Sequence, residues 1–147
     1  MARFLFRLEA SLQIAEQALE TAQREFAQEV QRWQASVRAC EVQQKRYEDA
    51  QEGQRDAGRH RPEELGIWQI FAVEHQRRLQ RCELERMDQE PVMENARHVL
   101  LEAHREVEKF GRLKEKQARA FGLAELQKEQ KVLDETGQVL HWRQQQK

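Results

Sequence analysis

Large apolar residues recur every seven positions through the first third of the chain. A repeat of seven returns to the same side of an α-helix every two turns, which is the spacing of a coiled-coil interface. A companion row follows three residues later at Leu8, Ala15 and Ala22, and then four residues later at Val30 and Val37. The other faces are mostly charged residues, Gln and Ala, so this helix needs a second one to cover its apolar stripe. The main row consists of Leu5, Leu12, Leu19, Phe26, Trp33, Cys40 and Tyr47.

Helix-breaking residues then interrupt the pattern. The repeat predicts a helix over about residues 7–54, because neither proline nor glycine occurs there before Gly53. Gly53, Gly58 and Pro62 predict a connection over about 55–62. Glycine tolerates the left-handed conformation at a helix end, and proline suits the first turn of the next helix. A connection this short makes the two helices antiparallel neighbours.

A second ladder predicts a helix over about residues 63–143. Its register continues through Pro91, which favours a kink there over the alternative of a helix end at Asp88–Glu90. Near Phe121 the stripe shifts to a row of Leu126, Leu133 and Leu140. The two rows of the ladder are Leu65, Ala72, Leu79, Arg86, Met93, Leu100, Val107, Lys114 and Phe121, and Trp68, His75, Cys82, Gln89, Ala96, Ala103 and Phe110.

The two ladders pair within one chain. With a connection centred near residue 58, Tyr47 faces Trp68 and Cys40 faces His75, so a bridge between Cys40 and Cys82 is not expected. In this pairing the first helix covers the second helix only as far as about residue 112, which leaves about 35 residues at the C-terminal end without a partner. The sequence therefore predicts an all-α fold: a long antiparallel two-helix coiled coil, or helical hairpin, with an overhanging C-terminal helix. We expect a single coiled-coil domain over residues 1–147.

Composition supports long helices and limits the function classes. Charged residues make up 35% of the chain and the hydrophobic set only 39%, which is typical of extended helices rather than a compact core. The net charge of −1 gives no support for nucleic-acid binding. No apolar run approaches the roughly 18 residues of a membrane span, and the N-terminus lacks a signal-peptide core. We expect a cytoplasmic protein.

The motifs of catalysis are absent from the sequence. It contains no glycine-rich phosphate loop, no nucleophile elbow and no paired-cysteine metal spacing. His75 lies on the seam without a second ligand near it in sequence, so a partly buried hairpin residue is the preferred interpretation. We therefore expect no enzyme, no cofactor and no metal site.

Two apolar features fall outside the predicted pairing. Ile67, Ile70 and Phe71 lie off the seam at the start of the second helix. They form either a partner site or a patch that the connection covers. The row of Leu126, Leu133 and Leu140 belongs either to a solvated helix or to one that docks into another protein.

Three short segments carry a further signal. Residues 4–9 (FLFRLE) precede the long charged helix, residues 107–116 read VEKFGRLKEK, and residues 127–135 read QKEQKVLDE. These segments and the helical architecture resemble flagellar export proteins of the FliJ type over nearly the whole chain. The resemblance implies a non-enzymatic component of the flagellar type III export apparatus. Such proteins form an antiparallel coiled coil similar to the central-stalk γ subunit of rotary ATP synthases.

The resemblance also implies partners. They are a hexameric export ATPase, the cytoplasmic region of the export gate membrane protein and export chaperones, which would hold the protein peripherally at the inner membrane. The alternatives are a generic helical-hairpin chaperone or adaptor, and a structural coiled coil that self-associates through its C-terminal leucine row. We expect a monomer. The implied gate contacts are Cys40, Gln44, Tyr47, Trp68, Phe71 and His75, and the implied contacts to the ATPase ring are Phe4, Phe6, Leu126 and Leu133.

Overall fold

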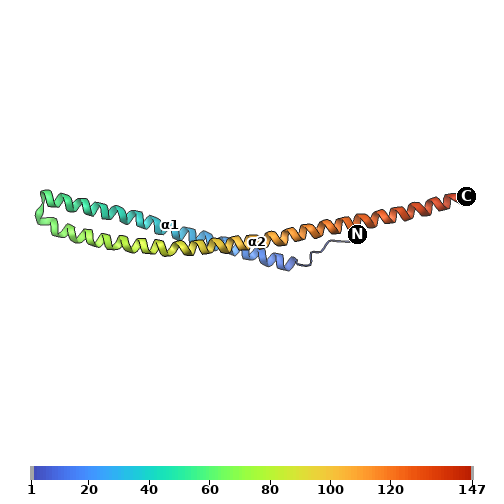
Figure 1. Ribbon diagram of the computed structural model, residues 1–147, viewed down its shortest axis with the longest axis horizontal. Helices are drawn as coiled ribbons and strands as arrows, with labels where there is room; N and C mark the ends of the chain where they lie inside the picture. Colours follow the sequence, from blue (N-terminus) through green and yellow to red (C-terminus); the bar gives the residue numbers. More distant parts are fainter. Residues whose placement is uncertain (1, 147) are drawn as a thin grey trace. The chain divides into compact units, whose positions relative to one another are not determined.

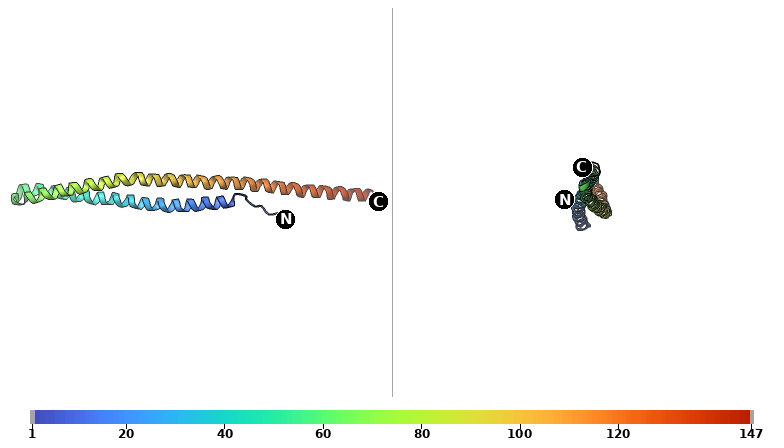
Figure 2. Two further views of the ribbon diagram at one scale, coloured as in Figure 1. Left: turned by 90° about the horizontal axis from the view of Figure 1, so that it is seen from below. Right: turned by 90° about the vertical axis from the view of Figure 1, so that its left-hand side faces the viewer.

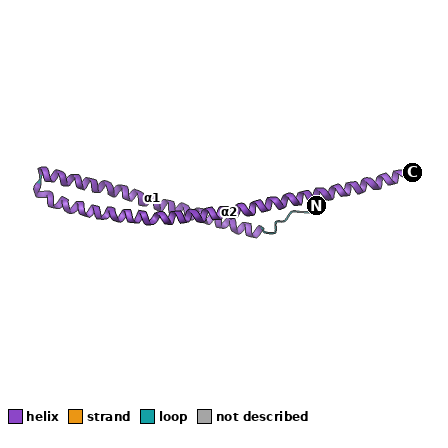
Figure 3. Ribbon diagram, viewed as in Figure 1, coloured by secondary structure: helices purple, strands orange, loops and turns teal. Residues whose placement is uncertain are grey.

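The computed structural model describes residues 2–146 and consists of two long α-helices (Figures 1 and 3). Helix α1 spans Glu9–His60 and helix α2 spans Leu65–Gln145, with a short 3-10 helix, η1, at Pro62–Glu64. No strand occurs within residues 2–146. The prediction of an all-α helical hairpin is confirmed.

Contacts along the chain group into two compact units, where the sequence predicts a single domain. Unit 1 comprises Met1–Ala18 and Ala103–Lys147, and unit 2 comprises Leu19–Glu102. Each unit contains one stretch of α1 and one of α2. In unit 2, α1 and α2 lie side by side in both the side view and the view from below (Figures 1 and 2).

Helix α1 continues through Gly53 and Gly58 and ends at His60, beyond the predicted end near residue 54. The expectation that these glycines terminate the helix is wrong. A glycine that ends a helix usually adopts a left-handed backbone with positive φ, and no glycine among the described residues does so. The helix ends instead where Pro62 removes a backbone donor. At its N-terminal end α1 begins at Glu9 rather than near residue 7.

Arg61 makes the reversal between the two helices. Its backbone is extended, with φ of −142°, and its amide donates to the carbonyl oxygen of Ala57 at 2.8 Å. Its guanidinium donates to Asp56 at 2.7 Å and lies 3.3 Å from Glu64. The hydrogen bond to Asp56 raises the pKa of Arg61. One residue and a 3-10 turn therefore replace the longer connection expected from the sequence.

Helix α2 is continuous across Pro91. The alternative of a helix end at Asp88–Glu90 is not observed, and Pro91 lies inside one helix of 81 residues. Proline in a helix interior removes one hydrogen bond, which a helix of this length accommodates between flanking turns.

The pairing register within unit 2 differs from the predicted one. Trp68 lies against Gly53 rather than Tyr47, and His75 bonds to Gln43 rather than facing Cys40. The facing part of α1 is thus displaced by about one to two helical turns. The cause is the extra length of α1, which moves the reversal from residue 58 to Arg61.

The interface of unit 2 is lined by small residues on α1. The three-residue offset of the companion row continues to buried Gln43, Ala50 and Ala57, and between Ala22 and Gln43 the residues of both offsets are half-buried: Glu29, Val30, Ser36 and Val37. Alanines at these positions allow close approach of the helices, and larger side chains from α2 fill the space. The buried residues of unit 2 are Ala22, Gln43, Ala50, Ala57, Ala72 and Leu79.

Unit 1 has a separate small core around its N-terminal segment. Phe6, Leu12 and Ala15 are buried. The ammonium of Lys114 lies 6.0 Å from the centre of the Phe6 ring and 2.8 Å from the Glu9 carboxylate. These contacts attach residues 4–9 to the α2 part of the same unit.

Candidate partner-binding surfaces

An aromatic groove lies between α1 and α2 near the reversal, within unit 2. Its walls and floor come from both helices, and we call it the tip groove. Side chains at i, i+3 and i+7 fall on one face of a helix, which brings the three α2 residues into a line. The lining residues are Arg46, Asp49 and Ala50 on α1 and Trp68, Phe71 and His75 on α2.

The α2 wall of the tip groove is a continuous row of rings. The centroids of the Trp68 and Phe71 rings are 6.1 Å apart, and those of Phe71 and His75 are 5.6 Å apart with planes inclined by 26°. Phe71 is 52% exposed, whereas Trp68 and His75 are half-buried. An exposed phenyl ring supported by two neighbouring rings is a preformed apolar contact surface.

The α1 side of the tip groove contributes one small residue and two charged residues. Ala50 is buried and forms the floor, while Arg46 and Asp49 are exposed. Neither charge belongs to an ion pair within residues 2–146. The groove therefore offers one cation, one anion and an aromatic surface.

The buried side-chain amide of Gln43 on α1 contacts His75 on α2. Gln43 is 6% exposed, and its Nε2 lies 2.9 Å from Nδ1 of His75 and 3.4 Å from the carbonyl oxygen of the same residue. A buried side-chain amide needs such partners, because an unpaired one costs about 1–3 kcal/mol. The pair links the two helices at the base of the tip groove.

The six residues implied for gate binding do not all meet. Trp68, Phe71 and His75 line the tip groove together. Cys40, Gln44 and Tyr47 lie elsewhere on α1.

The three α1 residues have different surroundings. Cys40 is half-buried, and burial, followed by the neighbouring Cys82, raises the pKa of its thiol. Gln44 is exposed and donates to Glu48 at 3.0 Å. The hydroxyl of half-buried Tyr47 accepts a hydrogen bond from Gln51 at 2.8 Å.

Sequence reasoning missed the α1 residues that do line or support the groove. These are Gln43 beneath His75, together with Arg46 and Asp49. A signal for Gln43 was present, because it lies seven residues before Ala50 and seven after Ser36. Continuing the three-residue offset of the companion row to residue 43 would have placed Gln43 in the interface.

An apolar patch extends from the tip groove along α2. The connection does not cover it, so of the two interpretations of Ile67, Ile70 and Phe71 the covered one is wrong. Apolar side chains at this spacing and exposure are uncommon on a surface that meets only water. The exposed fractions are 62% for Ile67, 73% for Ile70, 52% for Phe71 and 55% for Val73.

Unit 1 carries a second exposed apolar row at the C-terminal end of α2. Leu126, Leu133 and Leu140 are 62%, 66% and 54% exposed, respectively. Leu133 and Val132 form a shallow pocket with Lys128 and Glu129. The overhang of the C-terminal helix itself stays a prediction.

The two phenylalanines implied for ATPase binding pack within unit 1. The rings of Phe4 and Phe121 are 5.6 Å apart, and Phe6 is buried at 8% exposure. Of the four residues implied for the ATPase contact, Leu126 and Leu133 present apolar area outward, whereas Phe6 supports the fold of the unit.

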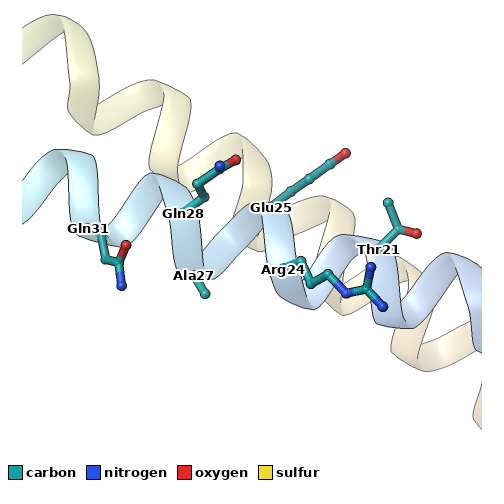
Figure 4. A pocket seen from close by; sticks show the side chains of 6 residues that line it. All are labelled: Thr21, Arg24, Glu25, Ala27, Gln28 and Gln31. Atoms are coloured by element: carbon teal, nitrogen blue, oxygen red, sulfur yellow. The ribbon is translucent and has the colours of Figure 1, made fainter.

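A further pocket lies on α1 and is formed by that helix alone. The pocket in Figure 4 is lined by a single stretch of α1, and its polar side chains spread along the helix instead of converging. Its residues are Thr21, Arg24, Glu25, Ala27, Gln28 and Gln31. Across residues 2–146, no three His, Cys, Asp or Glu side chains come together in a way that could hold a metal ion.

Neither helix contains, within the described residues, a stretch both long and apolar enough to cross a membrane.

The comparisons with known proteins give one family. Searches of curated proteins and of solved structures found no match. The family model of the flagellar FliJ protein matches residues 4–146, which is nearly the whole chain. A match of this extent covers both helices, the reversal and both apolar surfaces. The chain therefore belongs to the flagellar FliJ protein family, whose role is in flagellar protein export.

Proposed function

We propose that the protein is a non-enzymatic part of the flagellar type III export apparatus that links its ATPase to its gate. In this proposal it binds the hexameric export ATPase as a central stalk, contacts the cytoplasmic region of the export gate membrane protein and escorts export chaperones. It acts as a monomer without a cofactor, in the cytoplasm, and is held at the inner membrane through the apparatus.

The exposed phenyl ring of Phe71 in the tip groove is the observation that carries the gate contact. Contact sites that dominate protein interfaces are typically aromatic residues set in a shallow pocket and surrounded by a rim that excludes water. Trp68 and His75 flank the Phe71 ring, and Ile67 and Ile70 extend the apolar area. We assign the tip groove and this patch to the gate.

The leucine row of unit 1 supports a separate ATPase contact. Leu126 and Leu133 are more than half exposed on a helix whose flanking residues include Lys128 and Lys131. An apolar stripe with charged flanks suits insertion of a helix between other helices. We assign this row to the ATPase ring.

Replacement of Phe71 by alanine tests the gate assignment. We expect the affinity of the full-length protein for the purified cytoplasmic region of the export gate to fall by about tenfold or more, since a central aromatic contact contributes about 2 kcal/mol. Calorimetry measures the affinity, and circular dichroism should show unchanged helix content because Phe71 is half exposed.

Leu84→Ala is the matched control, because Leu84 is 61% exposed on the same helix but lies outside the tip groove. Its affinity for the gate region should equal that of the wild type. Equal losses in both variants, or none in Phe71→Ala, would show that the groove is not the gate contact.

The exposed leucine row also favours one competing function, a structural coiled coil that pairs with a second copy. Light scattering distinguishes this structural role from the proposed role as a central stalk. A concentration-dependent dimer that Leu133→Ala dissolves would support the structural role, whereas a monomeric mass supports the stalk.

A further inference from the structure

The polar pair Gln43–His75 joins the two helices within their interface, next to small residues of α1. Gln43 occupies a companion-row position on α1, where Ala50 and Ala57 follow at the same spacing. Burying an amide without partners is unfavourable, so its geometry is fixed by the atoms it meets. Those atoms are Nδ1 and the carbonyl oxygen of His75.

The contact with the carbonyl oxygen determines which way the amide points. A carbonyl oxygen only accepts hydrogen bonds, so the group 3.4 Å from it must be the NH2 of Gln43 and not the amide oxygen. The same NH2 faces Nδ1 of His75 at 2.9 Å. Nδ1 must therefore accept, which leaves the proton of the neutral ring on Nε2.

The Nε2–H of His75 has no acceptor among residues 2–146, while His75 lines the tip groove beside Phe71. We propose that Gln43 is a positioning residue that fixes His75 as the Nε2–H tautomer, so that His75 presents an imidazole N–H donor to the tip groove next to an aromatic surface. The occupant is a partner segment with an apolar side chain on the Phe71 ring and a backbone carbonyl at Nε2.

The charges of the groove favour a backbone carbonyl over a carboxylate as the acceptor. Arg46 and Asp49 both line the groove, so its local charge is balanced and does not select an anion. A carbonyl at the end of a helix or in an extended segment accepts from an imidazole N–H without bringing a charge. The assignment of this segment to the export gate rests on the proposed function.

Nitrogen-15 spectroscopy of the free full-length protein tests the tautomer directly. At about pH 8, where an ordinary histidine is neutral, we expect the proton of His75 on Nε2. A proton on Nδ1, or an even mixture of the two forms, would overturn the proposal. This measurement needs no partner and does not depend on the proposed function.

Gln43→Glu reverses the polarity of the hydrogen bond. A carboxylate accepts from Nδ1–H, so at about pH 8 the variant leaves Nε2 as a lone pair in the groove. We expect its affinity for the purified cytoplasmic region of the export gate to fall about tenfold. The hydrogen bond is lost, and the lone pair of Nε2 then faces the carbonyl oxygen of the partner, which is also an acceptor.

Gln43→Leu is the matched control, since it removes the hydrogen bond without reversing it. It should bind the gate region more tightly than Gln43→Glu at about pH 8. The charged groups that line the groove with the ring are Arg46 and Asp49. Equal losses of affinity in both variants would show that Gln43 only packs in the interface, and would overturn the proposal.

The Arg46→Ala variant distinguishes a backbone carbonyl from a carboxylate as the acceptor for His75. A backbone carbonyl predicts less than a threefold loss of affinity at about 0.1 M salt, whereas a carboxylate predicts a larger loss that disappears at about 1 M salt. The larger, salt-sensitive loss would overturn the carbonyl assignment. A wild-type protein that fails to bind the gate region would refute the proposed function and the assignment of the groove, while the tautomer is decided by spectroscopy alone.

Discussion

Gly53 provides the space that the indole ring of Trp68 occupies. A Cβ atom placed on Gly53 would lie closer than 3.0 Å to three ring carbons of Trp68. Glycine inside a helix costs about 1 kcal/mol relative to alanine, so its position here needs a compensating contact. That contact is the close approach of the Trp68 ring to the backbone of α1, which also forms one end of the tip groove.

Gly53→Ala should destabilise the protein although it raises helix propensity. The added methyl group forces Trp68 to move, and overpacking of this kind costs about 1–3 kcal/mol, more than the gain of about 1 kcal/mol from alanine. Urea unfolding followed by circular dichroism measures the difference.

Gly66→Ala is the control for this change. Gly66 is in α2, and a Cβ atom added to it would meet no neighbouring atom within 4 Å, so alanine there should stabilise the protein by about 0.5–1 kcal/mol. If both variants gain stability, the close approach of Trp68 to Gly53 does not exist in solution.

At the scale of the helices, the seven-residue repeat was sufficient to predict which faces meet. The row from Leu12 to Tyr47 and the row from Leu65 to Phe121 lie in the interface at most positions, because apolar burial selects one stripe of a helix whatever its partner. The antiparallel arrangement followed from the position of Pro62 and the shortness of the connection.

The register between α1 and α2 could not be predicted, because a glycine in a helical sequence can either end the helix or make room for a side chain of a neighbouring helix. Gly53 and Gly58 resemble helix-ending residues in sequence, but Gly53 admits an aromatic ring from another helix. Only the partner helix reveals which use applies. None of the three α1 residues implied for gate binding lines the tip groove, whereas Gln43 meets His75.

The two cysteines provide a test of the register. On α1, Cys40 lies between Glu29 and Gln43, which bond to Gln89 and His75 on α2, and Cys82 lies near enough to Cys40 to raise the pKa of its thiol. We therefore expect oxidised glutathione to produce an intramolecular Cys40–Cys82 disulfide. Both thiols lose their hydrogens and the oxidant leaves as two reduced thiols. Mass spectrometry of peptides identifies the bridge.

The pH dependence of this reaction follows from the burial of Cys40. Burial raises the pKa of the Cys40 thiol, so less reactive thiolate is present at a given pH, and the rate should keep increasing to higher pH than that of an exposed thiol. The control carries Cys82→Ser and His75→Cys, which restores the pairing expected from the sequence. Faster cross-linking in this control than in the wild type would refute the observed register.

At the scale of the whole molecule, one helix carries both proposed contacts. Phe71 and Leu133 both belong to α2, the first in unit 2 and the second in unit 1. If each unit binds its own partner, changes in one should leave the binding of the other intact, because no partner-binding residue is shared. Coupling of ATPase and gate would then require both surfaces on the same chain.

Paired variants test this requirement. The double variant Leu126→Ala with Leu133→Ala should lose stimulation of the purified export ATPase and keep gate binding, and Phe71→Ala should do the reverse. We expect at least a tenfold effect on the affected partner, which is about 1.4 kcal/mol. Ile14→Ala is the control in unit 1, since Ile14 is 67% exposed and belongs to neither surface. A double variant that loses gate binding as well would contradict independent contacts.

Coexpression of the two variants in cells that lack the wild-type protein completes the test. A protein that couples two partners must bind both with one chain, so a mixture of chains, each with one intact surface, should not restore swimming. Two independent adaptors would complement each other under the same conditions. Restored swimming at normal protein levels would therefore refute coupling, even if both contacts exist, since each contact would then act without the other.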